Sequence, residues 1–323
     1  MPPKQSCRFL RISDNYDSWR IVKILISGGT GLIGSALIRA ITQNKDQVTL
    51  ISRTPANLNP ELNPIPWNLD RISLEMESTD VVINLAGASI AGSSPLSIRW
   101  TPKRKSLIKS SRIFAGEMLS RAIRNSSHKP EVLIQASAIG FYGIQGSQAA
   151  DESTSYGDDF LAEVCRSWED STSGVEELGV RRVITRLGLV LSTAGGLLPL
   201  LSLPFKLYLG GPLGNGQQPM SWIHIKDVVQ AYRHFIEHPN TQGTYNLTSP
   251  VPTNNISFSA AIARTLSRPN WLAVPAVAVK LALGEASTLA LEGREVLPRR
   301  LLESGYEFQF KQIDSALINL FHN

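Results

Sequence analysis

Cysteine is scarce in this chain of 323 residues: Cys7 and Cys165 are its only two, and they stand far apart. Two isolated cysteines exclude a disulfide framework and a zinc site built from cysteine pairs. Of the five histidines only His234 and His238 stand at ligand spacing, and they lack a third ligand. The sequence therefore predicts no metal site and a protein of a reducing compartment, which we take to be the cytoplasm.

An apolar leader is also missing. Residues 1–20 are basic and carry no hydrophobic run of the kind that a secretory signal needs. We interpret them as an N-terminal extension, and an organelle-targeting piece is the alternative interpretation.

A long uncharged run does occur, but it is a poor membrane span. Residues 187–205 contain no charge over nineteen positions, which reaches the length of a transmembrane helix. The pair Gly195-Gly196 and the prolines Pro199 and Pro204 break a helix there. We expect a buried strand over Leu187–Leu191 that runs out into a loop, and no transmembrane segment.

The charge balance is basic, with a net charge of +5 and a pI near 9.2. This favours anionic ligands, but the basic residues are spread along the chain without a nucleic-acid motif, so nucleic acid is not an expected partner. The most basic stretch, Arg99–Arg112, reads as a helix after Pro102. Lys105, Lys109 and Arg112 share one face of it. That face is either solvated or directed at cofactor phosphates or an acidic substrate.

The strongest positive signal is the stretch Val22–Ser35, VKILISGGTGLIGS, which combines an apolar run, a glycine cluster and a helical pattern. This order predicts a buried strand, a tight turn and a helix. Gly28, Gly29, Gly31 and Gly34 fit the dinucleotide fingerprint, in which glycines allow a sharp turn, close approach to a pyrophosphate and close helix packing. The helix N-terminus then meets the anion with free N–H groups.

The residues that end the second strand indicate which dinucleotide binds. The helix Leu32–Gln43 and the strand Gln47–Ser52 complete a β-α-β unit. An NAD site usually has a carboxylate at this strand end to hold the ribose 2′-hydroxyl. Ser52 and Arg53 stand here instead. Because a guanidinium pairs with a 2′-phosphate, we expect NADP(H) as the cofactor.

The rest of the chain predicts an α/β fold with a doubly wound parallel sheet of the Rossmann type and a smaller, mainly helical carboxyl-terminal substrate lobe. Alternating strands and helices continue to Leu191, and Gly, Pro and Leu dominate the sequence after it. We assign residues 21–240 to the dinucleotide-binding domain, with 187–222 contributing to the substrate lobe, and 241–323 to the carboxyl-terminal lobe.

The ordered motifs of the chain resemble a known family. GGTGLIG, NLAG, SAIGFYG, DFLAEVCRSWE, RLGLVLSTAGG and GGPLGNGQQPMSWIHIKD are similar to segments of the extended short-chain dehydrogenase/reductases. The chain looks most like the atypical epimerase family proteins of the bacterial YfcH type, some of which carry cell-division labels in cyanobacteria and plastids. LEGREVLPRRLLESGYEF resembles the carboxyl-terminal domain of unknown function in that family. If residues 1–20 are a targeting piece, this resemblance implies the plastid stroma.

The resemblance implies a set of cofactor contacts. Around the pyrophosphate it implies Gly28, Thr30, Gly31, Leu32, Ile33 and Gly34. It implies Ser52 and Arg53 at the adenosine phosphate, and the small-residue loop Asn84, Leu85, Ala86 and Gly87 beside the adenine and ribose. Ser111 and Leu189 are further implied neighbours of the ligand.

The catalytic groups of the superfamily do not carry over. Its reductases use a Tyr-x-x-x-Lys pair, in which the lysine lowers the pKa of the tyrosine. Phe160 and Val164 stand at that spacing here, and Ala138 replaces the usual hydroxyl residue. Tyr142 and Ser137 follow a strand end and are the substitute candidates for a catalytic proton donor.

Two functions are therefore open. The first is an NADP(H)-dependent reductase or epimerase of a small carbonyl or sugar-nucleotide substrate. The second is a non-catalytic NADP(H)-binding regulator or scaffold with a protein partner, linked to cell or plastid division. The missing Tyr-x-x-x-Lys pair favours the second function, and the intact nucleotide motif is compatible with both.

Overall fold

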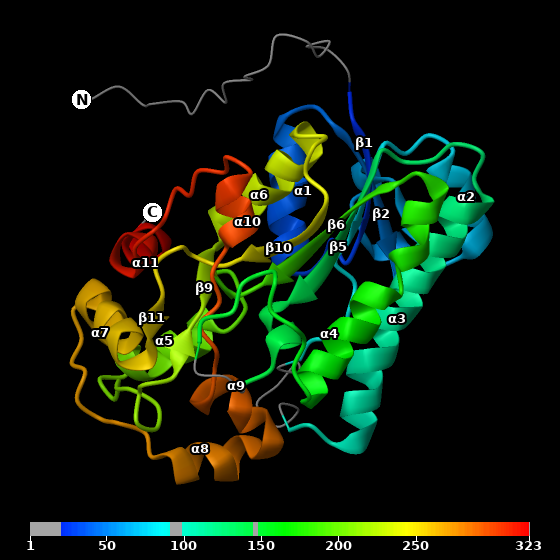
Figure 1. Cartoon of the computed structure of the whole chain (residues 1–323). Helices are drawn as coiled ribbons and strands as arrows, with labels where there is room; N and C mark the ends of the chain where they lie inside the picture. The colour runs from blue at the N-terminus through cyan, green and yellow to red at the C-terminus, as the bar shows by residue number, and fades with distance from the viewer. Residues whose placement is uncertain (1–20, 91–98, 145–147, 323) are drawn as a thin grey trace, which may run out of the picture.

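A parallel sheet of seven strands forms the centre of the computed structural model, which describes residues 21–90, 99–144 and 148–322 (Figure 1). The strands are β1 (Lys23–Ser27), β2 (Gln47–Ser52), β3 (Pro64–Pro66), β4 (Val81–Asn84), β5 (Val132–Ala138), β6 (Arg181–Leu187) and β10 (Gly243–Leu247). They lie in the order β10-β6-β5-β4-β1-β2-β3, and all neighbours are parallel. The strand order reverses between β1 and β4, which is where doubly wound sheets bind their ligands. The predicted Rossmann-type fold is confirmed.

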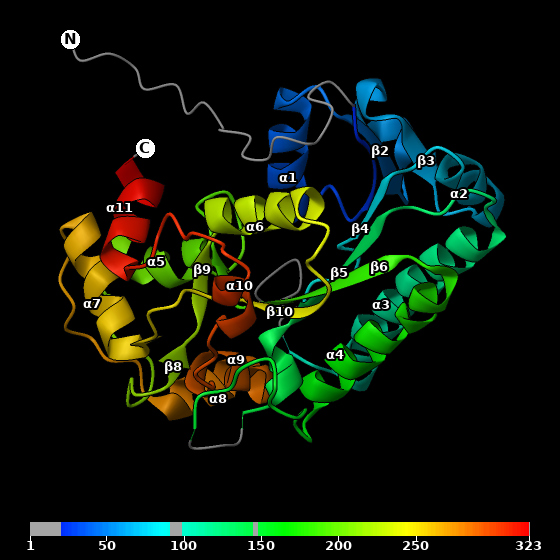
Figure 2. The ribbon, with the colours of Figure 1, turned by 45° about the horizontal axis from the view of Figure 1, so that its top comes forward.

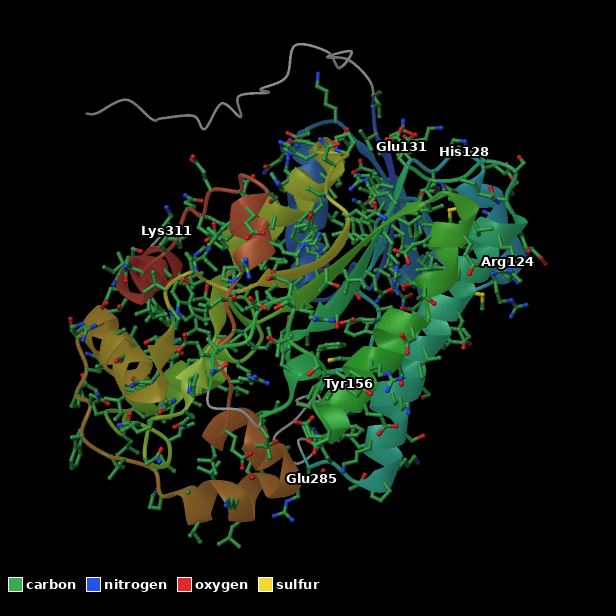
Figure 3. All side chains as sticks on the ribbon, in the orientation of Figure 1. Arg124, His128, Glu131, Tyr156, Glu285 and Lys311 are labelled. Carbon is green, nitrogen blue, oxygen red and sulfur yellow. The ribbon has the colours of Figure 1, made fainter. Side chains whose placement is uncertain are left out.

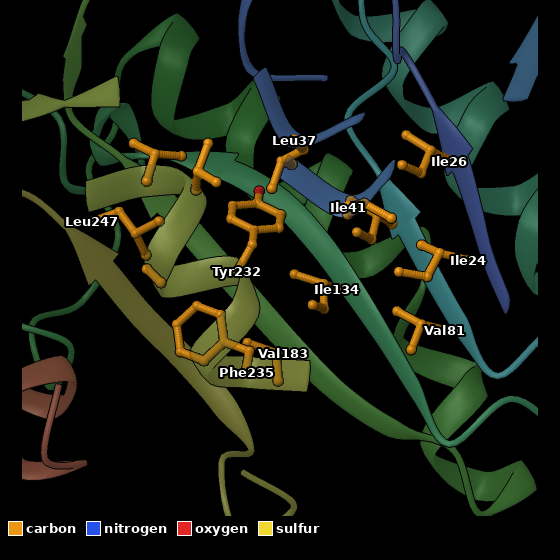
Figure 4. Packing of buried hydrophobic residues seen from close by; sticks show 14 of the residues in the cluster. Ile24, Ile26, Leu37, Ile41, Val81, Ile134, Val183, Tyr232, Phe235 and Leu247 are labelled. Atoms are coloured by element: carbon orange, nitrogen blue, oxygen red, sulfur yellow. The ribbon is translucent and has the colours of Figure 1, made fainter. Parts of the chain in front are cut away.

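Helices α1 (Leu32–Gln43) and α6 (Ile225–Glu237) cover one face of the sheet (Figure 4). Tyr232 and Phe235 of α6 pack there with Ile134 and Val183 of the central strands. All four side chains are fully buried. Burying large apolar side chains of this kind typically contributes about 1.5–3 kcal/mol each, so this layer fixes α6 against the strands.

The opposite face is covered by α2 (Leu69–Met76) and α3 (Pro102–Asn125), with α4 (Phe160–Asp170) packed beside α3. Leu25 of β1 points into this second layer, whereas Ile24 and Ile26 point into the first. Side chains alternate between the faces of a strand, so an uninterrupted apolar run requires burial on both faces. The apolar run in the sequence is explained by this double covering.

The carboxyl-terminal lobe has two small sheets and a helical layer (Figure 2). Strand β7 (Leu189–Leu191) pairs with β9 (Trp222–His224), and β8 (Pro219–Met220) pairs with β11 (Thr253–Asn254). The helices are α5 (Leu198–Lys206), α7 (Asn255–Leu266), α8 (Ala276–Leu283), α9 (Thr288–Leu291), α10 (Arg299–Glu303) and α11 (Ile313–His322). Short 3₁₀ helices occur along the whole described chain, and only the last of them lies in this lobe. They are η1 (Pro55–Asn57), η2 (Pro60–Leu62), η4 (Ile139–Tyr142), η5 (Ser173–Leu178) and η6 (Gly284–Ser287). A separate apolar core, which includes Trp222 and Phe258, holds this lobe together.

Two boundaries differ from the sequence prediction. Strand β10 belongs to the main sheet, where it pairs with β6, so a lobe that starts at residue 241 is wrong at this point. The predicted strand Leu187–Leu191 is divided at Gly188, because Leu187 is the last residue of β6 and Leu189–Leu191 form β7. A Cβ on Gly188 would lie 2.3 Å from the carbonyl oxygen of Ser221, so the chain turns at this glycine toward β9.

The prolines of the uncharged run do not prevent a helix, which corrects the predicted loop. Pro199 lies in the first turn of α5, where its missing N–H breaks no helical bond. Pro204 lies inside the helix, which ends two residues later at Lys206. None of the helices described is both long and apolar enough to cross a membrane.

Candidate functional site

The glycine turn after β1 is closed so tightly that side chains are excluded from it. Gly28 has φ +73°, and its carbonyl accepts a hydrogen bond of 3.0 Å from the N–H of Gly31. A Cβ on Gly28 would lie 2.7 Å from the backbone of Leu85, and one on Gly34 would lie 2.5 Å from the oxygen of Gly28. The turn after β1 therefore touches the turn after β4 through backbone alone, as the fingerprint requires.

The first turn of α1 is available to an anion. Helix α1 begins after Gly31, no side chain caps it, and its first turn holds no acidic residue. Thr30 and Gly31 are exposed, and Leu32 and Ile33 are half-buried. The first N–H groups of a helix have no partner within it and carry a partial positive charge. This end of α1 thus matches the predicted pyrophosphate position.

Asn84 supports the loop after β4 from below. Its side chain is fully buried and accepts a hydrogen bond of 2.6 Å from the hydroxyl of Ser27. Its amide nitrogen donates to Gln135 over 2.9 Å, and its oxygen accepts from the N–H of Ala86 over 3.3 Å. Leu85 and Ala86 are half-buried and Gly87 is exposed. Asn84 therefore ties the ends of β1 and β4 to the middle of β5, and leaves the loop backbone facing outward.

Two adjacent residues of α3 clamp the same loop at Ala88. The hydroxyl of Ser111 accepts from the N–H of Ala88 over 2.9 Å. Arg112 donates to the carbonyl of Ala88 over 3.0 Å and to that of Ile108 over 2.9 Å. Gly87 leaves room for this arginine, since a Cβ would lie 3.0 Å from its Cζ atom. Ser111 was implied by the family resemblance, but the role of Arg112 was not foreseen.

Arg112 is a buried cation, with 7% of its surface exposed. Its guanidinium lies 4.8 Å from the ring centroid of Trp168, and burial lowers its pKa to about 10. The other two cations of the predicted basic face form ion pairs, Lys105 with Glu285 and Lys109 with Glu163. Figure 3 labels Glu285, which lies in the carboxyl-terminal lobe. The face is thus neither wholly solvated nor directed at phosphates.

The end of β2 presents Ser52 and Arg53. The hydroxyl of Ser52 accepts from the N–H of Thr54 over 3.1 Å. Arg53 is exposed, and no described residue forms an ion pair or hydrogen bond with its guanidinium. This cation is available to a ligand phosphate.

The side chain of Leu189 packs against the apolar core of the carboxyl-terminal lobe. Leu189 lies in β7, and its N–H donates to the carbonyl of Ser221 over 2.8 Å. The loop that follows β7 packs on the first residue of α1, because a Cβ on Gly196 would lie 3.0 Å from a methyl carbon of Leu32. The structure brings the glycine turn, the loop after β4 and Ser111 together, with the end of β2 beside them.

The two candidate proton donors lie in a buried polar network instead. The hydroxyl of Tyr142 donates to Asn246 over 2.7 Å and accepts from Arg186 over 3.0 Å. The hydroxyl of Ser137 donates to Glu169 over 2.6 Å, and Glu169 forms a two-bond ion pair with Arg186 at 2.9 Å. Tyr142 and Ser137 are each 1% exposed, and burial raises the pKa of Tyr142. Both hydroxyls are already bonded, so these contacts give no support to proton donation to a substrate.

The positions of the missing catalytic pair are filled by an apolar cluster. Val164 is buried and Phe160 half-buried, and both pack with Trp100, Ile108 and Ala286. The rings of Phe160 and Trp100 meet edge-on with centroids 5.4 Å apart. These two positions of α4 therefore attach the carboxyl-terminal lobe to α3 and carry no acid or base.

No group of three or more metal-ligating side chains gathers within residues 21–90, 99–144 and 148–322. The predicted surface histidines stack at 4.0 Å between ring centroids, and His234 also contacts the hydroxyl of Ser304 over 3.0 Å. The described residues thus give no metal site.

The lobe pocket is a cavity of about 420 Å³ where the segment after Tyr142 meets the carboxyl-terminal lobe. It is lined by Ile144, Asn215, Gln217, Gln218, Leu291, Glu292 and Gly293. This volume is within the range of small-molecule sites. Four of the lining side chains are polar.

The site fits a dinucleotide, because a Cβ is excluded at Gly28 and Gly34, the start of α1 is uncapped, and no described residue pairs with the exposed guanidinium of Arg53 at the end of β2. Fold and site together define a dinucleotide-binding α/β protein. The family model described as NAD dependent epimerase/dehydratase family matches residues 24–248, and the model of DUF1731, a domain of unknown function, matches residues 274–320. The chain belongs to the NAD dependent epimerase/dehydratase family. The match ends just after β10, in agreement with the place of that strand in the sheet.

Individual relatives agree with this assignment. An epimerase family protein of Staphylococcus saprophyticus is 40% identical over 300 residues, covering 92% of this chain and 99% of that protein. The structure of human epimerase family protein SDR39U1 with NADPH has a TM-score of 0.85 and 30% identity, covering 94% of this chain and 100% of that chain. A nucleoside-diphosphate sugar epimerase from Corynebacterium glutamicum has a TM-score of 0.74 and 28% identity, covering 93% of this chain and 58% of that chain. The predicted epimerase family and its carboxyl-terminal domain are confirmed.

Proposed function

We propose that the chain binds NADP(H) in the crevice at the carboxyl ends of β1, β2 and β4. The observation that carries this proposal is Arg53, an exposed cation at the end of β2 without an ion pair to any described residue. A 2′-phosphate is a suitable partner for it, since a guanidinium can bond two phosphate oxygens at once. The crystal structure of the human neighbour is one with NADPH, which supports the same choice.

The residues that would hold the cofactor fall into three groups. Backbone N–H groups of the glycine turn and of the start of α1 would donate hydrogen bonds to the pyrophosphate. These residues are Gly28, Thr30, Gly31, Leu32, Ile33 and Gly34. Ser52 and Arg53 would bind the 2′-phosphate, and Asn84, Leu85, Ala86, Gly87, Ser111 and Leu189 would line the adenosine and nicotinamide parts. When bound, the cofactor supplies hydride transfer at its nicotinamide ring.

Calorimetric titration with NADPH and NADH tests the cofactor proposal. Losing a charge-assisted pairing typically costs roughly 1.5–3 kcal/mol, which is about ten- to a hundredfold in affinity. We expect Arg53→Ala to weaken NADPH by this factor and to leave NADH almost unchanged. Arg39→Ala is the matched control, because Arg39 is an exposed arginine on α1. Equal affinities of the parent protein for NADPH and NADH would contradict the proposal.

For the use of the cofactor we propose an NADP(H)-dependent reductase or epimerase acting on a small carbonyl or sugar-nucleotide substrate. The lobe pocket favours it, because a polar cavity of this volume can hold a small molecule. The sugar epimerase named among the structural neighbours supports the substrate class. Tyr142 and Ser137 are both bonded within one buried network. Neither hydroxyl would therefore donate a proton to the substrate, and hydride transfer would be slow.

The second candidate is a non-catalytic NADP(H)-binding regulator or scaffold with a protein partner. The apolar cluster around Phe160 and Val164 favours it, because no acid or base remains at the usual place. Absorbance at the nicotinamide band separates the two candidates. Loss of NADPH during incubation with carbonyl compounds and sugar nucleotides supports the enzyme. Tight binding of NADPH without turnover on any pool supports the regulator.

We propose a cytoplasmic location, which the scarcity of cysteine and the bacterial relative support. The predicted extension, residues 1–20, lies outside the described residues. The plastid alternative gains no support from the relatives named above.

A further inference from the structure

Large apolar side chains are exposed along one edge of the carboxyl-terminal lobe. The stretch after α5 runs beside the stretch after α7, because the N–H groups of Trp271 and Leu272 donate to the carbonyl of Gly210 over 3.1 Å. Figure 1 shows the second stretch continuing along the lower edge of the molecule into α8. Exposed apolar side chains that gather in one place indicate an interaction surface. This apolar edge consists of Leu207, Leu209, Trp271, Leu272, Val277 and Leu281, which are between 42% and 70% exposed.

Helix α8 contributes an apolar face that no described element covers. Val277 and Leu281 stand four residues apart, so they lie on the same side of the helix, and both are exposed. Val279 on another side is buried and anchors α8 to the lobe. Residues 269–279 carry no charge at all. A helix that is apolar on all sides is typically buried, so α8 has the composition of a helix that acquires a cover.

Two aromatic side chains at this edge are held in place before any partner binds. The indole N–H of Trp271 donates to the carbonyl of Tyr208 over 3.0 Å. The guanidinium of Arg268 lies 4.5 Å from the ring centroid of Tyr208. Both rings stay more than half exposed. Side chains that are already fixed lose less entropy on binding, and Trp and Tyr are enriched where lipid headgroups meet acyl chains.

The charge along the apolar edge is positive. Lys206 is the last residue of α5, Arg268 precedes Trp271 in the second stretch, and Lys280 lies in α8. No described residue forms an ion pair with any of these three cations. Residues 178–226 and 238–284, which form the whole edge, contain no Asp or Glu. The edge therefore combines apolar side chains with uncompensated cations, which is complementary to an anionic surface that is apolar beneath.

We propose that the apolar edge binds the surface of an anionic lipid bilayer. The apolar side chains enter the boundary between headgroups and acyl chains, and the three cations pair with lipid phosphates. A second copy of the chain is a poorer occupant. A two-fold interface brings the same patch together from both copies, so cations would face cations without an acid between them. This inference goes beyond the proposed binding of NADP(H) and does not depend on it.

Vesicle flotation tests the proposal on the full chain. One set of vesicles contains phosphatidylcholine and phosphatidylglycerol in equal parts, and the other contains phosphatidylcholine alone. We expect binding to the anionic vesicles to be at least about tenfold tighter, since each cation near an anionic surface contributes about a factor of five.

Two substitutions at the edge separate its apolar and charged contributions. Leu281→Ser should weaken binding to the anionic vesicles about tenfold, because a leucine side chain no longer leaves water. Lys280→Gln should weaken it about fivefold. The matched controls are Leu74→Ser on α2 and Lys45→Gln in the turn before β2, both at exposed positions outside the edge. Neither control should change binding, and equal midpoints of thermal unfolding show that all four variants are folded.

Three results would overturn the proposal. The first is no binding to the anionic vesicles, or equal binding to both kinds of vesicle. The second is an equal loss from Lys280→Gln and Lys45→Gln, because the net charge of the chain would then bind the lipid and not the apolar edge. The third is a dimer in sedimentation without lipid that Leu281→Ser dissociates, which would assign the edge to a second copy of the chain.

Discussion

Two regions at the main sheet are built in opposite ways: the open region at β1, β2 and β4, and the closed region at β5, β6 and β10. At β1, β2 and β4 the chain offers glycine turns, an uncapped helix start and Arg53, which pairs with none of the described residues, so backbone and charge are left open. At β5, β6 and β10 the polar side chains are buried and bonded to one another, as with Glu169 and Arg186. The first region is arranged to receive a ligand and the second to hold itself together. Substitutions in the open region should therefore act on binding, and those in the closed region on stability.

The largest effect is expected from Glu169→Gln in the closed region. The change removes the charge partner of Arg186, which is 5% exposed. Breaking a buried ion pair on one side typically costs about 3–5 kcal/mol, because the other charge stays buried and unpaired. Urea denaturation measures the loss of unfolding free energy. Glu163→Gln on the same helix is the control, because its ion pair with Lys109 is exposed and surface pairs contribute little. Equal effects of the two changes would end the contrast between the regions.

The next largest effect is expected from Gly34→Ala in the open region. The new methyl group would lie 2.5 Å from backbone atoms of Gly28 and Gly29, which cannot move aside as a side chain can. We expect NADPH affinity to fall about a hundredfold, as the turn must open and overpacking costs roughly 1–3 kcal/mol. Gly174→Ala is the control, since its nearest neighbour is the flexible end of Arg124 at 3.4 Å. Unchanged NADPH affinity would show that the turn does not hold the cofactor.

Acid should weaken the carboxyl-terminal lobe through His224. This ring is fully buried and stacks on Phe310 at 3.9 Å, and burial lowers its pKa to about 4 from an ordinary value of 6.5. The unfolded chain binds the proton more readily, so stability is present above pH 6.5 and is lost as the pH falls toward 4. We expect His224 to contribute on the order of 2 kcal/mol to this loss. Thermal unfolding between pH 7 and 4 should be less acid-sensitive in His224→Gln than in the parent, and identical slopes would refute the assignment.

The smallest effect is expected from Tyr142→Phe, which also tests the predicted catalytic role. The change removes hydrogen bonds to Asn246 and Arg186 inside the closed network. We expect a loss of about 1–3 kcal/mol in unfolding free energy, with NADPH affinity and turnover unchanged. A 10²–10⁴-fold loss of turnover at full stability would instead restore Tyr142 as the proton donor.

Local signals in the sequence were sufficient for the open region. The predicted bounds of the helix Leu32–Gln43 and the strand Gln47–Ser52 agree with α1 and β2, because apolar periodicity and glycine spacing act within a few residues. The glycine turn depends on backbone conformation that glycine alone allows, so its residues were identifiable directly.

The closed region depends on contacts between distant segments, and the sequence did not reveal it. Strand β10 has five residues and acquires its place only by pairing with β6, so it was assigned to the lobe. No local pattern in the sequence pairs Glu169 with Arg186, which tertiary packing buries together. Arg112 is a similar case, because its helical spacing indicated a basic face that is either solvated or directed at phosphates or an acidic substrate. The polar lobe pocket was missed because its walls come from segments more than 70 residues apart, as the bond between Gln218 and Ala290 shows.

The backbone contact between Gly28 and Leu85 has a consequence for folding. A ligand held by both turns needs β1 and β4 docked side by side, so it binds the folded chain and not partly folded forms. Such a ligand stabilises the native state by mass action, by about 2.7 kcal/mol at a concentration of 100 times its Kd. The cofactor would then act as a folding ligand, and its supply in the cell would set how much of a weakened variant survives in native form.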